Sequence, residues 1–316
     1  MRILFLLLFL ARGLQAIEYQ KAFTYRLRKG DLKAGEAIEH LKKLNVNYLV
    51  LVFELKSDKD SPIIYKDKLT PDDSSLKDII KKAHSLGMKT VLKPHIFTDG
   101  WCAYIKFKSE ASWQRWEEYY KYWICHYADL AEECNAEGFV VGAELWRTSQ
   151  REDMWRNIIA LARERFSGFL TYSAYYPEIQ KIRFWDALDY IGICPYFSLS
   201  QSSCPTLAQL KKKWEYWLNL IEKWQKKIGK PVLFTEIGFP SIDGASIKPW
   251  ALEDKARVDY DEQALCYEAT FQATKERSWI YGMYWWHWEE KDDPSGFTPF
   301  KKPACKVIAD WYKCLP

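Results

Sequence analysis

The chain has 316 residues, of which 48% are hydrophobic and 16% aromatic, and its formal net charge is +4. That length can bury a sizeable core and suits either one large α/β barrel or two ordinary domains. The 46 basic and 42 acidic residues nearly balance, and the lysine pairs fall on exposed faces of predicted helices, which argues against a nucleic-acid partner.

The first 16 residues have the pattern of a signal peptide. Met1 and Arg2 precede an apolar run over residues 3–10, and a small-residue cleavage site ends at Ala16. We therefore expect a signal peptide over 1–16 and a secreted, extracellular mature chain over 17–316. The apolar run is too short to span a bilayer comfortably, and no later segment has about 20 apolar residues without charge, so we expect no membrane partner. Anchoring by the uncleaved signal is the alternative.

Beyond residue 16, short apolar runs alternate with longer amphipathic stretches, a pattern typical of repeated βα units. Strands are predicted over residues 21–25, 48–55, 90–96, 138–145, 170–175, 190–196, 231–237 and 281–288. Helices are predicted over residues 35–44, 76–86, 112–134, 151–166, 207–228, 262–276 and 303–312. The fifth interval, 177–188, predicts only a turn of helix. No linker divides the chain, so the predicted fold class is α/β, a single-domain (β/α)8 TIM barrel.

Eight cysteines follow the expected cleavage point, and in an oxidising compartment an even count favours disulfides over metal ligation. We expect two local pairs, Cys194 with Cys204 and Cys305 with Cys314, because short loops would bring each pair together. Free buried thiols are the alternative for the other four.

Two glutamates end predicted strands that are otherwise apolar. Glu144 closes the fourth strand and Glu236 lies at the end of the seventh, so both side chains are expected at the mouth of the barrel. Burying a carboxyl group is costly unless it is paired, hydrogen-bonded or functional. Hydrolysis of a glycosidic bond needs two such groups, one to protonate the leaving oxygen and one to act at the anomeric carbon. A structural ion pair is the alternative for this pair.

Several longer motifs make the likeness to a known family specific. They are LKPH at 92–95, HYADLAEE at 126–133, GxEL at 142–145 (x is any residue), FWDALDYIGI at 184–193 with Tyr196, KPVLFTEIG at 230–238 and PW at 249–250. Over nearly the whole mature chain the sequence resembles glycoside hydrolase family 113, whose members are best known as β-1,4-mannanases. The resemblance implies a retaining double displacement with Glu144 as general acid/base and Glu236 as nucleophile.

Rings and polar groups at other predicted strand ends complete the expected site. Trp286 is expected to form the floor of the subsite where the bond breaks, with Trp288 beside the mouth, although core packing is the alternative for both. Tyr196 is expected to hydrogen-bond the nucleophile and His95 to hold a sugar hydroxyl, and a core position is the alternative for each.

The sequence departs from the bacterial members of the family at four positions near the expected cleft. Ala143 stands where Thr is usual, Cys102, after Trp101, where Arg is usual, Phe97 where Asp is usual and Tyr175 where Asn is usual. Trp101 and Tyr175 complete the predicted substrate-binding residues. Loss of polar groups and gain of rings favours stacking over hydroxyl recognition, so the substrate is either mannan or glucomannan or another β-linked polysaccharide.

No metal-ligand spacing, phosphate loop or catalytic serine motif is present, so we expect no metal and no cofactor. The predicted protein is a monomeric, secreted hydrolase whose partner is a polysaccharide or oligosaccharide. A secreted barrel that binds glycan without cutting it is the main alternative, and a structural protein held by disulfides is the third.

Overall fold

The computed structural model describes residues 18–252, 256–291 and 293–316. The expected signal peptide, residues 1–16, lies outside the described residues. Among those that are described, no helix is both long and apolar enough to cross a bilayer.

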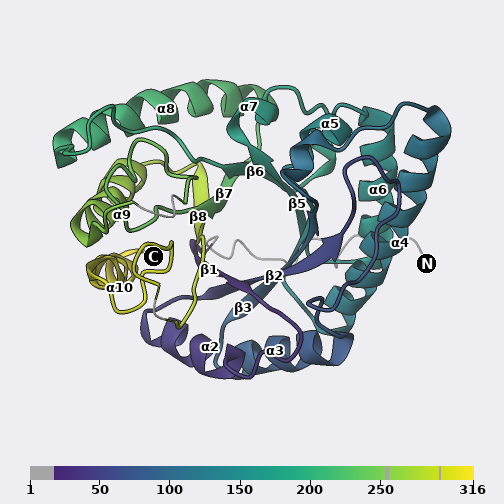
Figure 1. Ribbon diagram of the computed structural model, residues 1–316, viewed down its shortest axis with the longest axis horizontal. Helices are drawn as coiled ribbons and strands as arrows, with labels where there is room; N and C mark the ends of the chain where they lie inside the picture. Colours follow the sequence, from purple (N-terminus) through teal and green to yellow (C-terminus); the bar gives the residue numbers. More distant parts are fainter. Residues whose placement is uncertain (1–17, 253–255, 292) are drawn as a thin grey trace, which may run out of the picture.

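Eight parallel strands form a closed barrel in chain order, and β1 pairs with β8 to close it (Figure 1). The strands are β1 (Gln20–Arg26), β2 (Tyr48–Lys56), β3 (Lys89–Phe97), β4 (Gly138–Ala143), β5 (Phe169–Tyr175), β6 (Tyr190–Cys194), β7 (Val232–Ile237) and β8 (Ile280–Trp285). All eight predicted strands are present. The predicted (β/α)8 barrel is therefore confirmed, and because its strands are parallel their carboxyl ends share one face.

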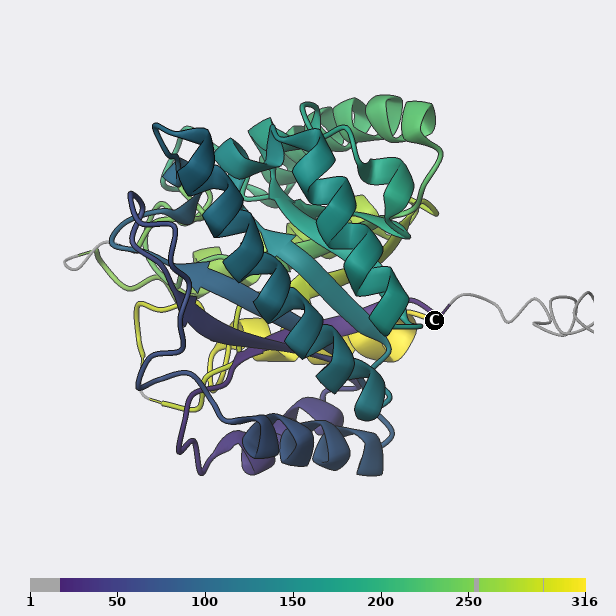
Figure 2. The ribbon, with the colours of Figure 1, turned by 90° about the vertical axis from the view of Figure 1, so that its right-hand side faces the viewer.

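Helices cover the outside of the barrel, as both ribbon views show (Figures 1 and 2). They are α2 (Ala34–Lys43), α3 (Asp73–Ser85), α4 (Glu110–Glu133), α5 (Trp146–Ser149), α6 (Glu152–Arg165), α7 (Tyr176–Ile179), α8 (Leu207–Ile228), α9 (Tyr260–Thr274) and α10 (Pro303–Cys314), with 3-10 turns η1 (Cys102–Tyr104) and η2 (Trp185–Ala187). The fifth interval holds only α7 and η2, as its short length predicts.

Helix α8 illustrates how the local sequence sets these boundaries. A capping box between Thr206 and Gln209 starts the helix, and Gly229, with φ of 75°, ends it in the left-handed conformation. Trp214 and Leu218 of this helix are buried against the barrel. These two side chains lie four residues apart, on one face of the helix, and belong to the core.

The two expected disulfides are absent, and all eight cysteines, which lie within the described residues, are free thiols. Cys305 and Cys314 both lie in α10, where nine residues at a rise of about 1.5 Å each separate them far beyond bonding distance. Cys194 is buried, with its Sγ 3.1 Å from the Ser173 hydroxyl, whereas Cys204 is exposed in the following loop. The expectation that short loops pair these cysteines was wrong, because one pair lies along a single helix and the other has one buried and one exposed member.

Candidate active site

The carboxyl ends of strands β4 to β8, the loops after β3 to β8 and one ring of α8 surround a cavity of about 820 Å3. Its lining residues are Trp101, Glu144, Tyr175, Tyr176, Pro177, Cys194, Tyr196, Phe197, Ser198, Trp217, Glu236, Trp250, Leu252, Trp286 and Phe297. Two carboxyl groups therefore face a space walled mainly by aromatic rings, on the face where barrels of this type carry their sites.

Glu144 does not end β4 but follows it directly. The register between β4 and β5 shifts between Val140 and Ala143, and Glu144 then takes a left-handed backbone conformation with φ of 53°. A Cβ atom at Gly142 would lie 2.4 Å from the Trp155 side chain, so only glycine fits there. The register shift and the left-handed conformation bend the chain at Glu144, whose carboxyl group faces the cavity.

The surroundings of Glu144 favour its protonated form. Burial and the neighbouring carboxylate of Glu236 raise the pKa of Glu144 to about 7, against the opposing effect of a hydrogen bond from Trp101. The indole Nε1 of Trp101 donates that bond to Oε2 at 3.0 Å. A substantial fraction of Glu144 therefore holds its proton at neutral pH.

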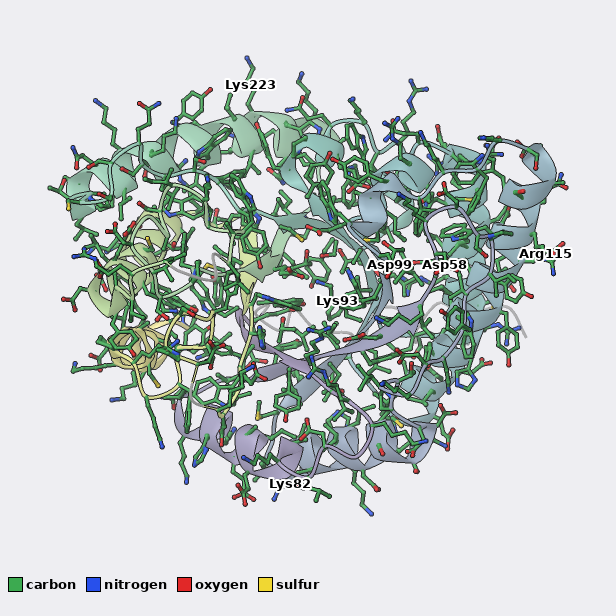
Figure 3. All side chains as sticks on the ribbon, viewed as in Figure 1. Asp58, Lys82, Lys93, Asp99, Arg115 and Lys223 are labelled. Carbon is green, nitrogen blue, oxygen red and sulfur yellow. The ribbon has the colours of Figure 1, made fainter. Side chains whose placement is uncertain are left out.

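Glu236 lies in β7 under the opposite influence. The ammonium group of Lys93, which is 1% exposed, lies 2.7 Å from Oε2, and the hydroxyl of Tyr196 donates to Oε1 at 3.1 Å. Burial alone would raise the pKa of Glu236, but these contacts hold it below its usual range. Figure 3 shows Lys93 inside the ring of strands, whereas Lys82 and Lys223 lie on the outer helices.

The cavity thus contains one carboxyl group whose surroundings favour the protonated form and one whose surroundings favour the ionised form. These are the two forms that acid-assisted displacement at an anomeric carbon requires, and the separation of two carboxyl pKa values by their environments is how such pairs divide their roles. Within the described residues, no group of three or more acidic, histidine or cysteine side chains is arranged to hold a metal ion.

The structure brings together Glu144, Glu236 and four of the six predicted substrate-binding residues. The four are Trp101, Tyr175, Tyr196 and Trp286. The rings of Trp101 and Tyr175 meet edge to face, with their centroids 4.8 Å apart.

The other two predicted residues do not line the cavity. Trp288 is 2% exposed and packs edge-on against Phe23 in the core, with ring centroids 5.5 Å apart. His95 lies against Phe97 and Cys102, and burial together with the nearby Lys93 lowers its pKa to about 4, so it is neutral.

Only one of the four departures from the family pattern reaches the cavity, and it is Tyr175. Cys102 is buried behind the bend, with its Sγ 3.8 Å from the carbonyl oxygens of Ala143 and Glu144. The Phe97 ring lies near the cations of Arg26 and Lys56.

Sequence reasoning missed Lys93 as part of the site, although a lysine within an apolar strand was a usable signal. Trp217 and Trp250 were also missed as wall residues. Trp217 belongs to a helical stripe that resembles core packing, whereas Trp250 is 55% exposed in the loop after β7.

A barrel that carries such a carboxyl pair in an aromatic-walled cavity has the form of a glycoside hydrolase. Comparison with protein families gives a match to Glycoside Hydrolase Family 113 over residues 22–297. The chain therefore belongs to this family and is a glycoside hydrolase.

Solved structures agree with this assignment. The chain is 30% identical to a GH113 β-1,4-mannanase solved as a complex, with a TM-score of 0.85, covering 94% of this chain and 99% of that one. It is 27% identical to the GH113 β-mannanase AaManA from Alicyclobacillus acidocaldarius in complex with ManMIm, with a TM-score of 0.87, covering 95% and 99%. No curated protein sequence matches the chain.

Proposed function

We propose that this glycoside hydrolase is a secreted endo-β-1,4-mannanase that cuts mannan or glucomannan with retention of configuration. The observation that carries the mechanism is the opposite displacement of two carboxyl pKa values in one cavity, up for Glu144 and down for Glu236. The two similar structures named as β-mannanases support the substrate class. The sequence of residues 1–16 supports secretion.

In the proposed first step, the carboxylate of Glu236 attacks the anomeric carbon while Glu144 gives its proton to the departing glycosidic oxygen. The bond to the leaving sugar breaks as an ester between the sugar and Glu236 forms. In the second step Glu144, now ionised, takes a proton from water, and the resulting hydroxide displaces Glu236 from the sugar. Two inversions at one carbon return the original β configuration.

Lys93 and Tyr196 support the role of Glu236 in this scheme. Their contacts stabilise its charge before attack and when it leaves the sugar. Trp286 supplies the ring beside the reacting sugar, and Trp101 combines a wall position with its bond to Glu144.

The first test is reducing-sugar release by the purified mature chain from mannan, glucomannan, β-glucan, xylan and chitin. We expect release from the two mannans, with the β anomer as the first product in proton NMR. Activity on another polymer alone would refute the mannanase proposal but would agree with the assignment as a glycoside hydrolase. An α product would refute retention. Binding without cleavage of any polymer would favour the glycan-binding alternative.

The pH dependence of kcat/KM gives a second prediction. The acid form of Glu144 is lost as the pH rises through about 7, so activity should fall on the alkaline side near that pH. Glu236 must be ionised, and its pKa lies below the usual carboxyl range, so kcat/KM should begin to fall on the acid side only below that range. Initial rates over a pH series in buffers of constant ionic strength measure both limbs. A plateau that continues far above neutrality would contradict the assignment of Glu144.

A further inference from the structure

A buried chain of hydrogen bonds lies directly behind Glu144. The hydroxyl of Tyr172, in β5, donates to Oε1 of Glu178 at 2.7 Å and accepts a bond from the amide of Leu145 at 2.8 Å. The side chains of Tyr172 and Glu178 are completely buried. One hydroxyl therefore connects a carboxyl group on α7 to the peptide bond that follows Glu144.

That peptide bond belongs to the only strained backbone in the cavity wall among the described residues. Glu144 is held at φ of 53°, where residues with a side chain are seldom found unless their surroundings hold them. Its own amide donates to the carbonyl oxygen of Ser173 at 2.8 Å, and the next amide donates to Tyr172. Both acceptors lie in β5, so this strand holds the bend on both sides of Glu144.

The holding groups are themselves fixed. The Tyr172 ring packs edge-on against the rings of Trp155 and Phe184, with centroid distances of 5.0 Å and 5.6 Å. Burial raises the pKa of Glu178 to about 8, so this carboxyl group is mostly neutral at pH 7 and can accept the tyrosine bond without the cost of a buried charge. Neither Tyr172 nor Glu178 lines the cavity, so neither is placed to contact a substrate bound in it.

We propose that Tyr172 and Glu178 are positioning residues, which hold the backbone at Glu144 so that its carboxyl group is aimed at the leaving oxygen. The proposal rests on the proposed role of Glu144 as acid/base. Removal of the Tyr172 hydroxyl takes away one of the two bonds by which β5 holds the amides of Glu144 and Leu145, and it leaves Glu236 and its partners unchanged.

The test compares substrates that differ in their need for a proton. In Tyr172→Phe, kcat/KM for an oligosaccharide of the preferred polymer should fall about 10- to 100-fold, as expected for a displaced catalytic group. For the 2,4-dinitrophenyl glycoside of the same sugar, kcat/KM should stay within about twofold of the parent enzyme, because that leaving group departs without protonation. Glu178→Leu should behave like Tyr172→Phe, whereas Glu178→Gln keeps an acceptor oxygen and should restore most of the oligosaccharide activity.

Tyr120→Phe is the matched control. Tyr120 is also buried, and its hydroxyl donates to the β4 carbonyl of Val141 at 2.9 Å, yet it makes no bond beside Glu144. Tyr120→Phe should lose about as much stability as Tyr172→Phe but keep its activity on the oligosaccharide. Equal losses on both substrates in Tyr172→Phe and Glu178→Leu, or the same selective loss in Tyr120→Phe, would overturn the proposal.

Glu144→Ala, measured in parallel, separates the positioning role of Tyr172 and Glu178 from the acid/base role of Glu144, on which it rests. Suppose that Glu144→Ala loses activity on the oligosaccharide alone, while Tyr172→Phe keeps its activity on both substrates. The acid/base role of Glu144 then stands and the positioning role of Tyr172 fails. If Glu144→Ala loses activity equally on both substrates, and azide does not restore it, the acid/base role of Glu144 is wrong.

Discussion

Glu236→Gln should lower kcat on the preferred polymer by a factor on the order of 10⁴ or more, with the fold unchanged. An amide cannot form the ester with the sugar, so the displacement loses its nucleophile. Substrate binding should persist, because the walls of the cavity are untouched. Steady-state kinetics and isothermal titration with an oligosaccharide measure the two effects separately.

Two further variants make this prediction specific. Glu236→Ala with added azide should convert a β-linked dinitrophenyl glycoside into the α-glycosyl azide, since azide enters from the vacated side. Glu164→Gln, on the exposed face of α6, is the matched control and should keep full activity. Residual activity of Glu236→Gln within tenfold of the parent enzyme would refute its role as nucleophile.

Lys93→Met should cost about 3 to 5 kcal/mol of stability at neutral pH, because it leaves Glu236, whose side chain is only 13% exposed, without its cation. The pKa of Glu236 should rise, since Lys93 is the main group that lowers it. The acid limb of the kcat/KM profile should therefore move to higher pH. Urea unfolding and the pH profile measure these effects.

The double variant Lys93→Met/Glu236→Gln shows whether charge is the cause. Removal of the second charge should recover part of the lost stability, so the double variant should be more stable than Lys93→Met alone. Lys82→Met is the surface control: its ion pair with Glu39 is exposed, and its loss should cost under about 1 kcal/mol. A double variant no more stable than the single one would show that lost packing, not the unpaired charge, explains the effect.

Much of the fold was predictable because each strand is a short apolar run between amphipathic helices. The eight strands lie within a few residues of their predicted places. The end of β8 was less predictable. A strand continued to residue 288 would place Trp286 and Trp288 on one face. Because β8 ends at Trp285, that alternation is lost, and Trp288 turns into the core while Trp286 lines the cavity.

The two glutamates and the bond from Tyr196 to Glu236 could be identified from the sequence, but the rest of their environment could not. The pairing of Lys93 with Glu236 joins β3 to β7 across the inside of the barrel, and no local pattern encodes such a contact. The strained backbone of Glu144 is likewise held by tertiary bonds from β5. Local sequence favours an ordinary strand end there, and only the packed neighbours overrule that preference.

The pairing of β1 with β8 has a consequence for how the protein is made. A parallel barrel has no free edge once it closes, but β1 has no partner on one side until Ile280–Trp285 have left the ribosome. Nearly the whole chain must therefore be synthesised before that edge is covered. A chain truncated after β7 would contain Glu144 and Glu236 but would have an open sheet, which is a template for aggregation.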